Sequence, residues 1–353
     1  MDVDSGRLEA FMGRMIGHMT GAALCYSIWL GDELGLYRAL AGSGPRTADS
    51  LAEETGCHPR LVREWLDGQA AGGLVAYDAD ADTSELGPEA AMALADDGSP
   101  VFVARGMNTF ASLFHDMSRI AEAFRGDGSL SWGDHHPCLF CGTEWFFRTG
   151  YRAHLTTAWI PALDGVDARL RAGARVADVG CGHGASVVTM AVAYPDSVFT
   201  GFDFHAPSIA TCRERAREAG VSGRVDFQVA TATGYTGEFD LICFFDCLHD
   251  MGDPVGAARH AREHLRPGGT VLLVEPFAID PRPRNIAENP MAALFYVASS
   301  CVCTPNSLSQ EVGAALGAQA GEAKLRAVFE EAGFRHFRRA AQTPMNLIIE
   351  ARA

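Results

Sequence analysis

Lysine is almost absent from this chain, and no apolar segment is long enough to enter a membrane. Lys324 is the one lysine among 29 basic residues, and arginine supplies the rest, a coding bias from which no function follows. No apolar run approaches the ~20 residues that cross a bilayer. No apolar N-terminal region precedes a cleavage site of small residues, as a secretory signal requires. The sequence therefore predicts a cytoplasmic protein without a membrane segment.

Positive charge is also scarce, which limits the partners of the protein. The 29 basic residues face 44 aspartates and glutamates, and the formal net charge is −15 at pH 7. A strongly acidic protein repels polyanions, so a nucleic-acid partner is not expected. Most of the ten cysteines lie in apolar segments, which favours reduced thiols packed as small hydrophobes over disulfides.

Residues 1–100 are predicted to form a small helical domain. The expected elements are helices at 8–40 (broken at Gly35), 48–55, 59–68 and 88–95, and a hairpin of 74–77 with 83–86. A helix-turn-helix followed by a hairpin is a winged helix. This region has six arginines, no lysine and 17 acidic residues, a formal charge of −11. A DNA-binding module needs a positive face, so we expect this domain not to bind DNA.

The remaining chain divides into residues 101–170 and residues 171–353. The first part is helical and aromatic-rich, with an interruption at 126–142, and is expected to link the domains and border a substrate pocket. The second part alternates strands with helices, which indicates a parallel sheet covered by helices on both faces. The predicted strands are 175–179, 197–203, 225–229, 239–245, 270–275, 334–340 and 346–351, with helices at 185–194, 207–219, 254–265 and 322–332. The last two strands form a hairpin, so the last strand is expected to be antiparallel.

A glycine-rich loop follows the first strand of this sheet. Gly180, Gly182 and Gly184 keep side chains out of the space where a ligand lies, and the helix that follows directs unpaired N–H groups toward that space. Ligands of a doubly wound sheet bind beyond the carboxyl ends of its strands. Asp203 ends the second strand, where a carboxylate can accept both ribose hydroxyls. These features fit a nicotinamide and an adenosyl ligand equally.

Two details separate these ligands. The third glycine comes one residue earlier than in the G-x-G-x-x-G loop of dinucleotide folds, and a reversed terminal strand does not belong to such a fold. Both features, with Leu265-Arg266-Pro267-Gly268-Gly269 before the fifth strand, resemble the class I S-adenosylmethionine (SAM)-dependent methyltransferases from about Arg175 to Ala351. The resemblance implies a Rossmann-like seven-stranded α/β fold, SAM as the cofactor and S-adenosylhomocysteine (SAH) as the product.

The resemblance also implies roles for the residues at the strand ends. Asp178 and the three loop glycines would face the amino-acid part of SAM, Asp203 the ribose and Phe204 the adenine. The family often has an acidic residue after the third strand that accepts the adenine amino group. Thr231 and Ala232 stand there in this chain, so Thr231 or a backbone carbonyl is expected to take that role.

The segment after the fourth strand resembles the L-H-D-W motif of winged-helix O-methyltransferases. His249, in Leu248-His249-Asp250-Met251, corresponds to their general base for an acceptor hydroxyl. An imidazole suits this role because it titrates near neutral pH. Glu275 matches the acidic residue that orients the histidine in that family. Asp246 is expected to lie beside the amino-acid end of SAM or beside the acceptor. Asp250 is expected to lie beside the acceptor. Members of this family build homodimers through the winged helix.

Two departures from that motif leave the reaction open. Met251 replaces its tryptophan, and Asp246 replaces the lysine common before its histidine. We expect O-methylation of a small aromatic or natural-product acceptor. Alternatives are N-, S- or C-methylation or SAM cyclisation on the same fold, and a SAM-binding winged-helix regulator. The whole chain also resembles actinobacterial proteins labelled methyltransferases or transcriptional regulators.

The stretch His135-His136-Pro137-Cys138-Leu139-Phe140-Cys141 is the last candidate site. Two imidazoles and a C-x-x-C pair could hold Zn²⁺, with Cys301 and Cys303 approaching in space. A second half with standard spacing is missing, so no metal is predicted. We expect the loop to lie over the acceptor pocket with one of its histidines touching the substrate, and an exposed loop is the alternative. Residues 277–320 are longer than a simple connection and are expected to form a lid.

Overall fold

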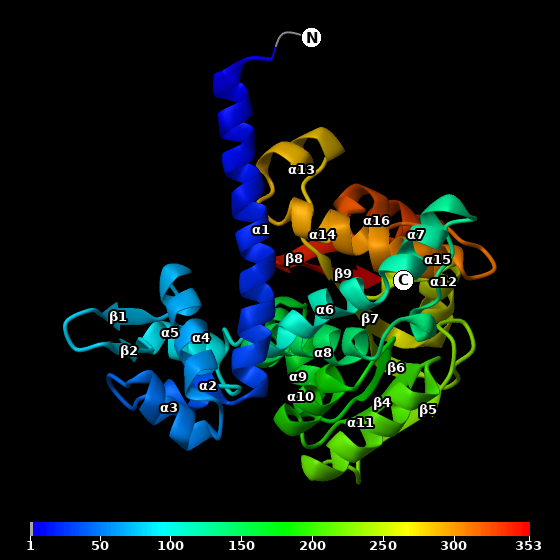
Figure 1. Cartoon of the computed structure of the whole chain (residues 1–353). Helices are drawn as coiled ribbons and strands as arrows, with labels where there is room; N and C mark the ends of the chain where they lie inside the picture. The colour runs from blue at the N-terminus through cyan, green and yellow to red at the C-terminus, as the bar shows by residue number, and fades with distance from the viewer. Residues whose placement is uncertain (1–2) are drawn as a thin grey trace. The chain divides into compact units, whose positions relative to one another are not determined.

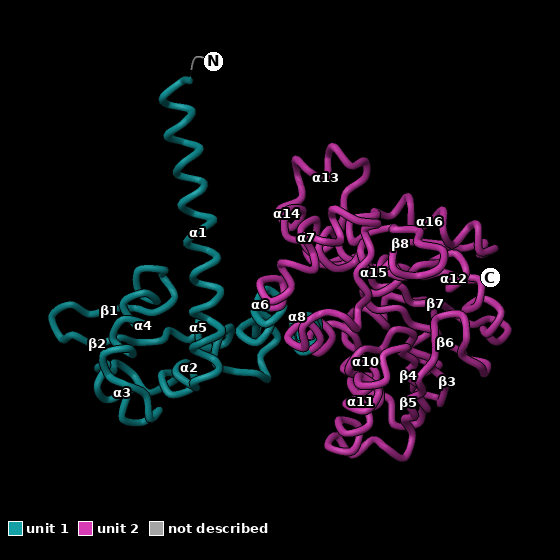
Figure 2. Tube along the Cα trace, turned by 45° about the vertical axis from the view of Figure 1, so that its right-hand side comes forward, with its two compact units in different colours: residues 1–111, 141–149 teal, residues 112–140, 150–353 magenta. Residues whose placement is uncertain are grey.

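The computed structural model describes residues 3–353, and the chain folds into two compact units. One comprises the chain up to Ala111 together with Cys141–Thr149, and the other comprises Ser112–Phe140 and Gly150–Ala353 (Figure 2). Helices α6 (Asn108–His115) and α8 (Cys138–Gly150) cross this division. The domain limits that we expect near residues 100 and 170 stay predictions.

The first unit contains the winged helix, as predicted. Besides parts of α6 and α8, the elements of this unit are α1 (Ser5–Glu33), α2 (Leu36–Leu40), α3 (Ala48–Thr55), α4 (Pro59–Ala71), β1 (Ala76–Asp78), β2 (Thr83–Glu85), α5 (Pro88–Leu94) and η1 (Ala104–Met107) (Figure 1). Gly35 ends α1 because it adopts a left-handed φ of 72°, which glycine reaches without steric cost. The Thr47 hydroxyl caps α3 by accepting the N–H of Ser50 at 3.2 Å. Tyr37, Leu51 and Trp65 belong to the core beneath these helices.

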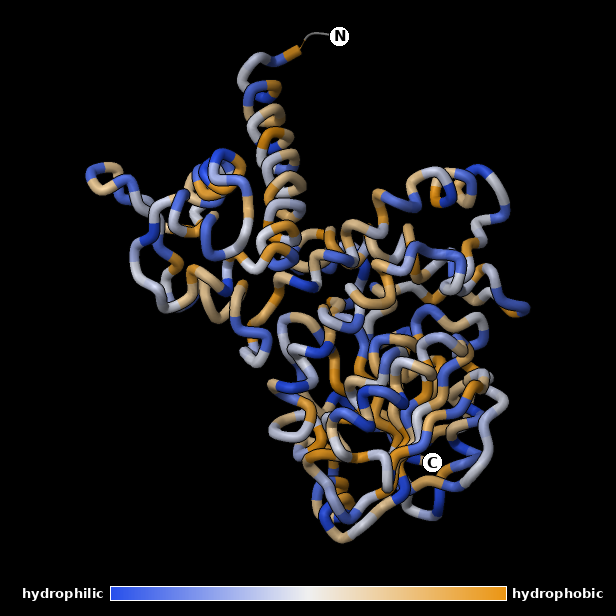
Figure 3. The backbone as a smooth tube through the Cα atoms, turned by 60° about the horizontal axis from the view of Figure 1, so that its bottom comes forward, coloured by the Kyte–Doolittle hydropathy of each residue, from blue (hydrophilic) through white to orange (hydrophobic). Residues whose placement is uncertain are grey.

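Helix α1 exposes most of its apolar side chains. Only Gly31 and Asp32 are buried along its 29 residues. Hydrophobic residues recur along the helix (Figure 3), and the large exposed ones are Leu8, Phe11, Met12, Met15, Ile16, Met19 and Tyr26. A spacing of three or four residues places most of them on one side of the helix.

The second unit is built on a seven-stranded sheet in the order β5-β4-β3-β6-β7-β9-β8. The strands are β3 (Arg175–Val179), β4 (Val198–Asp203), β5 (Val225–Val229), β6 (Phe239–Phe245), β7 (Leu265–Pro276), β8 (His336–Gln342) and β9 (Asn346–Arg352). The first five pair in parallel, whereas β9 pairs antiparallel with both β7 and β8. The predicted sheet with a reversed last strand is confirmed.

The second unit also contains helices before, between and after these strands. They are α7 (Met117–Arg125), η2 (Trp132–Asp134), η3 (Tyr151–Trp159), η4 (Ile160–Ala162), α9 (Val166–Arg171), α10 (Ala185–Ala193), α11 (Ala206–Glu218), η5 (Leu248–Asp250), α12 (Pro254–His264), α13 (Arg282–Glu288), α14 (Ala292–Ala298), η6 (Ser299–Cys303), α15 (Thr304–Leu308) and α16 (Gly321–Glu331). Helices α10 and α11 pack together and against β4, whereas α12 packs on α16 and β7. Ile242, Leu273 and Phe329 are among the fully buried residues of the core between sheet and helices.

Three sequence predictions need correction. The interruption predicted at 126–142 ends earlier, because α8 already begins at Cys138. Strand β7 begins at Leu265, not at residue 270, because Leu265 pairs with Phe239 across an irregular register. Strand β8 covers His336–Gln342, two residues later than expected.

No single helix among residues 3–353 is both long and apolar enough to cross a bilayer. The pair Arg282–Glu288 and Ala292–Leu308, bent by 118° at its break, meets the requirement by length and composition only.

Candidate active site at the carboxyl edge of the sheet

Four neighbouring strands end in the predicted acidic residues. Asp178 lies near the end of β3, Asp203 ends β4, Asp246 follows β6, and Glu275 lies near the end of β7. These strands lie side by side in the order β4-β3-β6-β7. Their carboxyl ends therefore gather the predicted carboxylates at one edge, where ligands bind in open α/β sheets.

The glycine loop is held against β4, and its three glycines serve different purposes. Gly180 and Cys181 both donate their N–H groups to the Phe202 carbonyl, at 2.8 and 3.0 Å. A Cβ on Gly180 would lie 2.8 Å from Cys247 Sγ, and one on Gly184 would lie 3.1 Å from the Phe227 ring. A Cβ on Gly182 would meet no atom within 4 Å. The space beside Gly182 is therefore open, whereas protein side chains lie against Gly180 and Gly184.

Asp203 links the glycine loop to the loop after β4. Its Oδ2 accepts the N–H of Gly182 at 2.9 Å, and its Oδ1 accepts the N–H of His205 at 2.8 Å. Burial raises the pKa of Asp203, although these two hydrogen bonds oppose the change. The next residue, Phe204, is 49% exposed, so its ring is accessible to a flat ligand. Thr231 is exposed after β5, and Ala232 beside it is half-buried.

Asp178 is the most deeply buried acid of the edge, at 1% exposure. The Ser186 hydroxyl donates to its Oδ2, whereas Oδ1 is buried and has no hydrogen-bond partner among the described residues. Burial raises the pKa of Asp178 to about 7. A buried acceptor without a donor marks a site for a polar or cationic ligand group. This orphaned oxygen and the open space at Gly182 fit the ammonium-bearing end of SAM.

His249 and Glu275 form a buried pair, as predicted. His249 Nδ1 lies 2.5 Å from Glu275 Oε2, and the backbone N–H groups of Leu248 and His249 lie 3.0 and 3.4 Å from Oε1. Burial alone would lower the pKa of His249, but the Glu275 carboxylate and then the Cys303 thiol outweigh it and raise the pKa well above its usual value.

Cys303 completes this group. Its Sγ lies 3.3 Å from His249 Nε2, and the thiol is buried. The sequence suggests Cys303 only as a ligand in the metal alternative at the 135–141 loop, which we do not predict, and it gives no sign of this contact with His249. His249 and Cys303 are 54 positions apart in the sequence, and no local sequence pattern predicts their contact.

Asp246 adopts a left-handed backbone with φ 50°, which is strained for a residue with a side chain. Two donors fix it: Tyr151 Oη lies 3.3 Å from Oδ2, and Asn346 Nδ2 lies 2.7 Å from Oδ1. Burial, and then the Glu275 charge, raise the pKa of Asp246 well above its usual range. Burial likewise raises the pKa of Asp250 to about 7. Tyr151 and Asn346 were not predicted, since neither lies in a recognisable motif.

The two histidines of the 135–141 loop face other partners. His135 is buried with Nδ1 3.0 Å from Asp116 Oδ2, and the His136 N–H donates to the same oxygen at 2.9 Å. The ring of His136 stacks on that of His115, with centroids 3.9 Å apart and planes 11° apart. Their contact with a substrate stays a prediction. The loop does reach the cofactor edge, because the Phe140 ring centroid lies 4.8 Å from that of His205.

One group of potential metal ligands occurs in this loop. The ligand atoms of His115, His136 and Cys138 lie within 4.8 Å of one another. A metal lies in the plane of each imidazole that binds it, and the planes of two stacked, nearly parallel rings do not converge. The observed arrangement is therefore unsuited to a shared ion without rotation of a ring.

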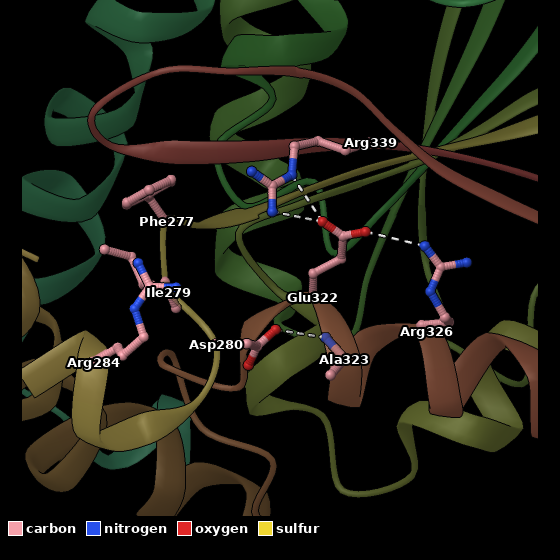
Figure 4. A pocket seen from close by; sticks show the side chains of 9 residues that line it. Phe277, Ile279, Asp280, Arg284, Glu322, Ala323, Arg326 and Arg339 are labelled. Atoms are coloured by element: carbon pink, nitrogen blue, oxygen red, sulfur yellow. Dashed lines mark hydrogen bonds and ion pairs between the residues drawn. The ribbon is translucent and has the colours of Figure 1, made fainter.

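Two pockets border the segment that follows β7. One of about 410 Å³ is bordered by Asp280, Arg326 and Arg339 (Figure 4), but Glu322 forms ion pairs with both arginines, at 3.0 Å to Arg326 and 2.6 Å to Arg339. Its charges are thus satisfied within the protein. A larger one of about 860 Å³ lies between residues 123–128 and the 279–324 region, within the predicted lid.

Two regions of the chain match known domain families. Residues 170–333 match the family described as "Methyltransferase domain", and residues 22–96 match the "Rv2258c-like winged HTH domain". The 27-O-demethylrifamycin SV methyltransferase of Amycolatopsis mediterranei is 35% identical over 120 residues, 33% of this chain and 43% of that protein. A ubiquinone biosynthesis O-methyltransferase of Pseudomonas aeruginosa is 32% identical over 130 residues, 36% of this chain and 50% of that protein. The chain thus spans half or less of these curated relatives.

Solved structures resemble the fold along its whole length. The mitomycin 7-O-methyltransferase MmcR has a TM-score of 0.68 and 23% identity, with 99% of this chain and 100% of that chain covered. CalO1, a methyltransferase of calicheamicin biosynthesis in its SAH-bound form, has a TM-score of 0.68, 22% identity and complete coverage of both chains. The chain has the fold of the class I SAM-dependent methyltransferases. It combines a region that matches a methyltransferase domain with an N-terminal region that matches a winged-helix domain.

Proposed function

We propose that this protein transfers a methyl group from SAM to an oxygen of a small natural-product acceptor. The observation that carries the proposal is the buried 2.5 Å contact between His249 Nδ1 and Glu275 Oε2. It leaves His249 Nε2 as the nitrogen that can take a proton from an acceptor hydroxyl when the imidazole is in its neutral form. The relatives named for mitomycin, rifamycin and calicheamicin support an acceptor of that chemical kind.

The residues at the strand ends have separate roles in this proposal. Asp178, Gly182 and Asp203 would hold SAM, which supplies a methyl group on a sulfonium leaving group. Catalysis then requires mainly that the acceptor oxygen be aligned and deprotonated. Glu275 fixes the orientation of the imidazole and stabilises the imidazolium that forms when Nε2 takes the proton.

The charges around His249 favour an acceptor without negative charge. Asp246, Asp250 and Glu275 are the carboxyl groups nearest in this arrangement, and burial raises the pKa of Asp250 to about 7. Another anion buried among these groups would lose its hydration, which is costly. We therefore propose neutral phenols or enols as the acceptor class.

The test uses the full-length protein with SAM and pairs of phenols that differ by one carboxylate. We expect SAH and a methylated neutral phenol, with much less product from its carboxylated partner. His249→Gln should lower turnover by about 10²–10⁴-fold, the usual contribution of a general base, with the Kd for SAH unchanged. His336→Gln is the control, because His336 is exposed on β8.

Two results would contradict the proposal. Full turnover by His249→Gln would remove His249 as the base. Methylthioadenosine in place of SAH would show that the aminobutyryl part of SAM is cyclised and that no methyl group is transferred.

We also propose that a second copy of the chain covers the apolar side of α1. The exposed residues on that side include Met12, Met15 and Met19, at 49%, 37% and 69% exposure. A solvated helix with so many apolar side chains on one side marks an interaction surface. Light scattering should give a dimer mass, and Met12→Asp with Met19→Asp should give the monomer mass. Arg14→Asp, on another side of the helix, should leave the dimer intact.

DNA binding by the winged helix is not proposed. In α4, which would be its recognition helix, Arg60 forms an ion pair with Glu64, and Arg63 lies 3.0 Å from Asp82. These arginines are engaged by acids on their own domain and offer little charge to phosphates.

A further inference from the structure

The thiol of Cys303 lies at the nitrogen of His249 that the proposed reaction needs. Glu275 engages Nδ1, so Nε2 is the imidazole nitrogen left for a substrate. Cys303 Sγ is 3.3 Å from that atom, in a setting where the three side chains are between 2% and 9% exposed. Glu275, His249 and Cys303 thus form a continuous carboxylate–imidazole–thiol chain.

The backbone around Cys303 is arranged to hold this contact. Cys303 ends η6, a π-helical segment between α14 and α15, and such segments occur frequently at functional sites. At the start of η6, Ser299 Oγ accepts the N–H of Ala318 at 3.1 Å, and the neighbouring Gly317 donates its N–H to the His249 carbonyl at 3.0 Å. The segment that carries the thiol is therefore tied to the backbone of the histidine.

We propose that Cys303 is a positioning residue of the acceptor site, whose thiol holds His249 Nε2 until the acceptor hydroxyl replaces it. This inference rests on the proposed function. A hydrogen bond from an acceptor to Nε2 requires the place that Sγ occupies, so the acceptor oxygen binds against Cys303. The residue thereby sets where the reacting oxygen lies and limits the size of the group that carries it.

The pKa of His249 depends on the charged and polar groups around it. These are Glu275 from β7, Cys303 from η6, and Asp250 and Asp246 from the segment after β6. Glu275 and Cys303 both raise the pKa of His249. Removal of the thiol should therefore lower that pKa while the Glu275 contact remains.

Nitrogen-15 NMR of labelled histidine side chains tests the contact in the full-length protein with SAH bound. Cys303→Ala should shift the His249 resonances and lower its pKa, and Cys303→Ser, which keeps a hydrogen-bonding group, should restore part of the effect. Cys301→Ser is the matched control, two residues earlier in η6, where the sulfur is 3.7 Å from Ser300 Oγ. An unchanged His249 titration in Cys303→Ala, or an equal change in Cys301→Ser, would overturn the proposal.

Methyl methanethiosulfonate provides a second test that does not rely on a folded alanine variant. Burial raises the pKa of the Cys303 thiol, so the reagent is applied at alkaline pH. The thiolate then displaces methanesulfinate and becomes a methyl disulfide, which adds an S–CH₃ group beside Nε2. With a phenol that the protein methylates, the reagent should abolish turnover, leave the Kd for SAH unchanged and be reversed by dithiothreitol. Cys303→Ser should resist it, with its KM for the phenol altered by about tenfold, as for loss of one pocket contact.

Equal inactivation of the wild type and Cys303→Ser would show that another cysteine is responsible and would contradict the role of Cys303. The two proposals fail in different ways. Absence of turnover with every phenol would count against the proposed function, whereas the NMR titration decides the Cys303 contact without any turnover.

Discussion

Glu275 holds His249 with both of its carboxylate oxygens. One lies 2.5 Å from Nδ1, and the other accepts the backbone N–H groups of Leu248 and His249 at 3.0 and 3.4 Å. The carboxylate therefore fixes the start of η5 as well as the ring. The charge and the geometry of Glu275 can be separated by substitution.

Glu275→Gln keeps the size of the side chain and removes its charge. The amide oxygen can still accept the backbone N–H groups, so we expect the fold and the Kd for SAH to be preserved. The imidazolium loses its counter-charge, and methyl transfer should fall by roughly 10²-fold or more, within the range of general-base contributions. Initial rates over a pH series measure this. Unaltered rates would exclude Glu275 from a role in proton transfer.

His249 should stabilise the folded protein more at low pH than at high pH. Its folded pKa is raised above the unfolded value of about 6.5, so its contribution to the free energy of unfolding is complete below that pH. It is lost as the pH rises through the folded pKa. Urea unfolding of wild type and His249→Gln should therefore differ most at low pH, and titrating groups that do not interact with His249 cancel in the comparison. A difference that grows with pH would contradict the sign.

The glycine loop allows a contrast between two alanine variants. Gly180→Ala places a Cβ 2.8 Å from Cys247 Sγ, and Gly182→Ala places one in open space. Both residues have positive φ, so each variant pays about 1–2 kcal/mol for the left-handed backbone. Gly180→Ala should lose more stability, whereas Gly182→Ala should lose SAH affinity out of proportion to its stability. Thermal unfolding and calorimetric titration with SAH separate the two effects.

Sequence patterns predicted this fold well because its strands are short apolar runs separated by helices. Arg175–Val179 and Phe239–Phe245 have the limits that their patterns indicate. His249 and Glu275 could be predicted because the segments that carry them resemble motifs of winged-helix O-methyltransferases. Cys303 could not, because its position at Nε2 depends on how η6 packs. Tyr151 and Asn346 were missed for the same reason, since each reaches Asp246 from a distant element.

Asp246 gives the last prediction, because its carboxyl is buried and both of its oxygens are engaged. Tyr151 donates to Oδ2, and Asn346 donates to Oδ1. In Asp246→Asn the amide oxygen can accept from Asn346 while the amide N–H₂ meets the tyrosine oxygen, so the contacts survive. The raised pKa means that ionisation of Asp246 destabilises the fold above the unfolded pKa of about 3.9.

Asp246→Asn should therefore equal or exceed the wild type in stability at neutral pH and match it in acid. Asp246→Ala leaves two donors without an acceptor and should cost about 1–3 kcal/mol for each that stays buried. Urea unfolding of the three proteins at acid and neutral pH measures both effects. Equal stability of the alanine and asparagine variants would show that the two hydrogen bonds to Asp246 do not hold the strained residue in place.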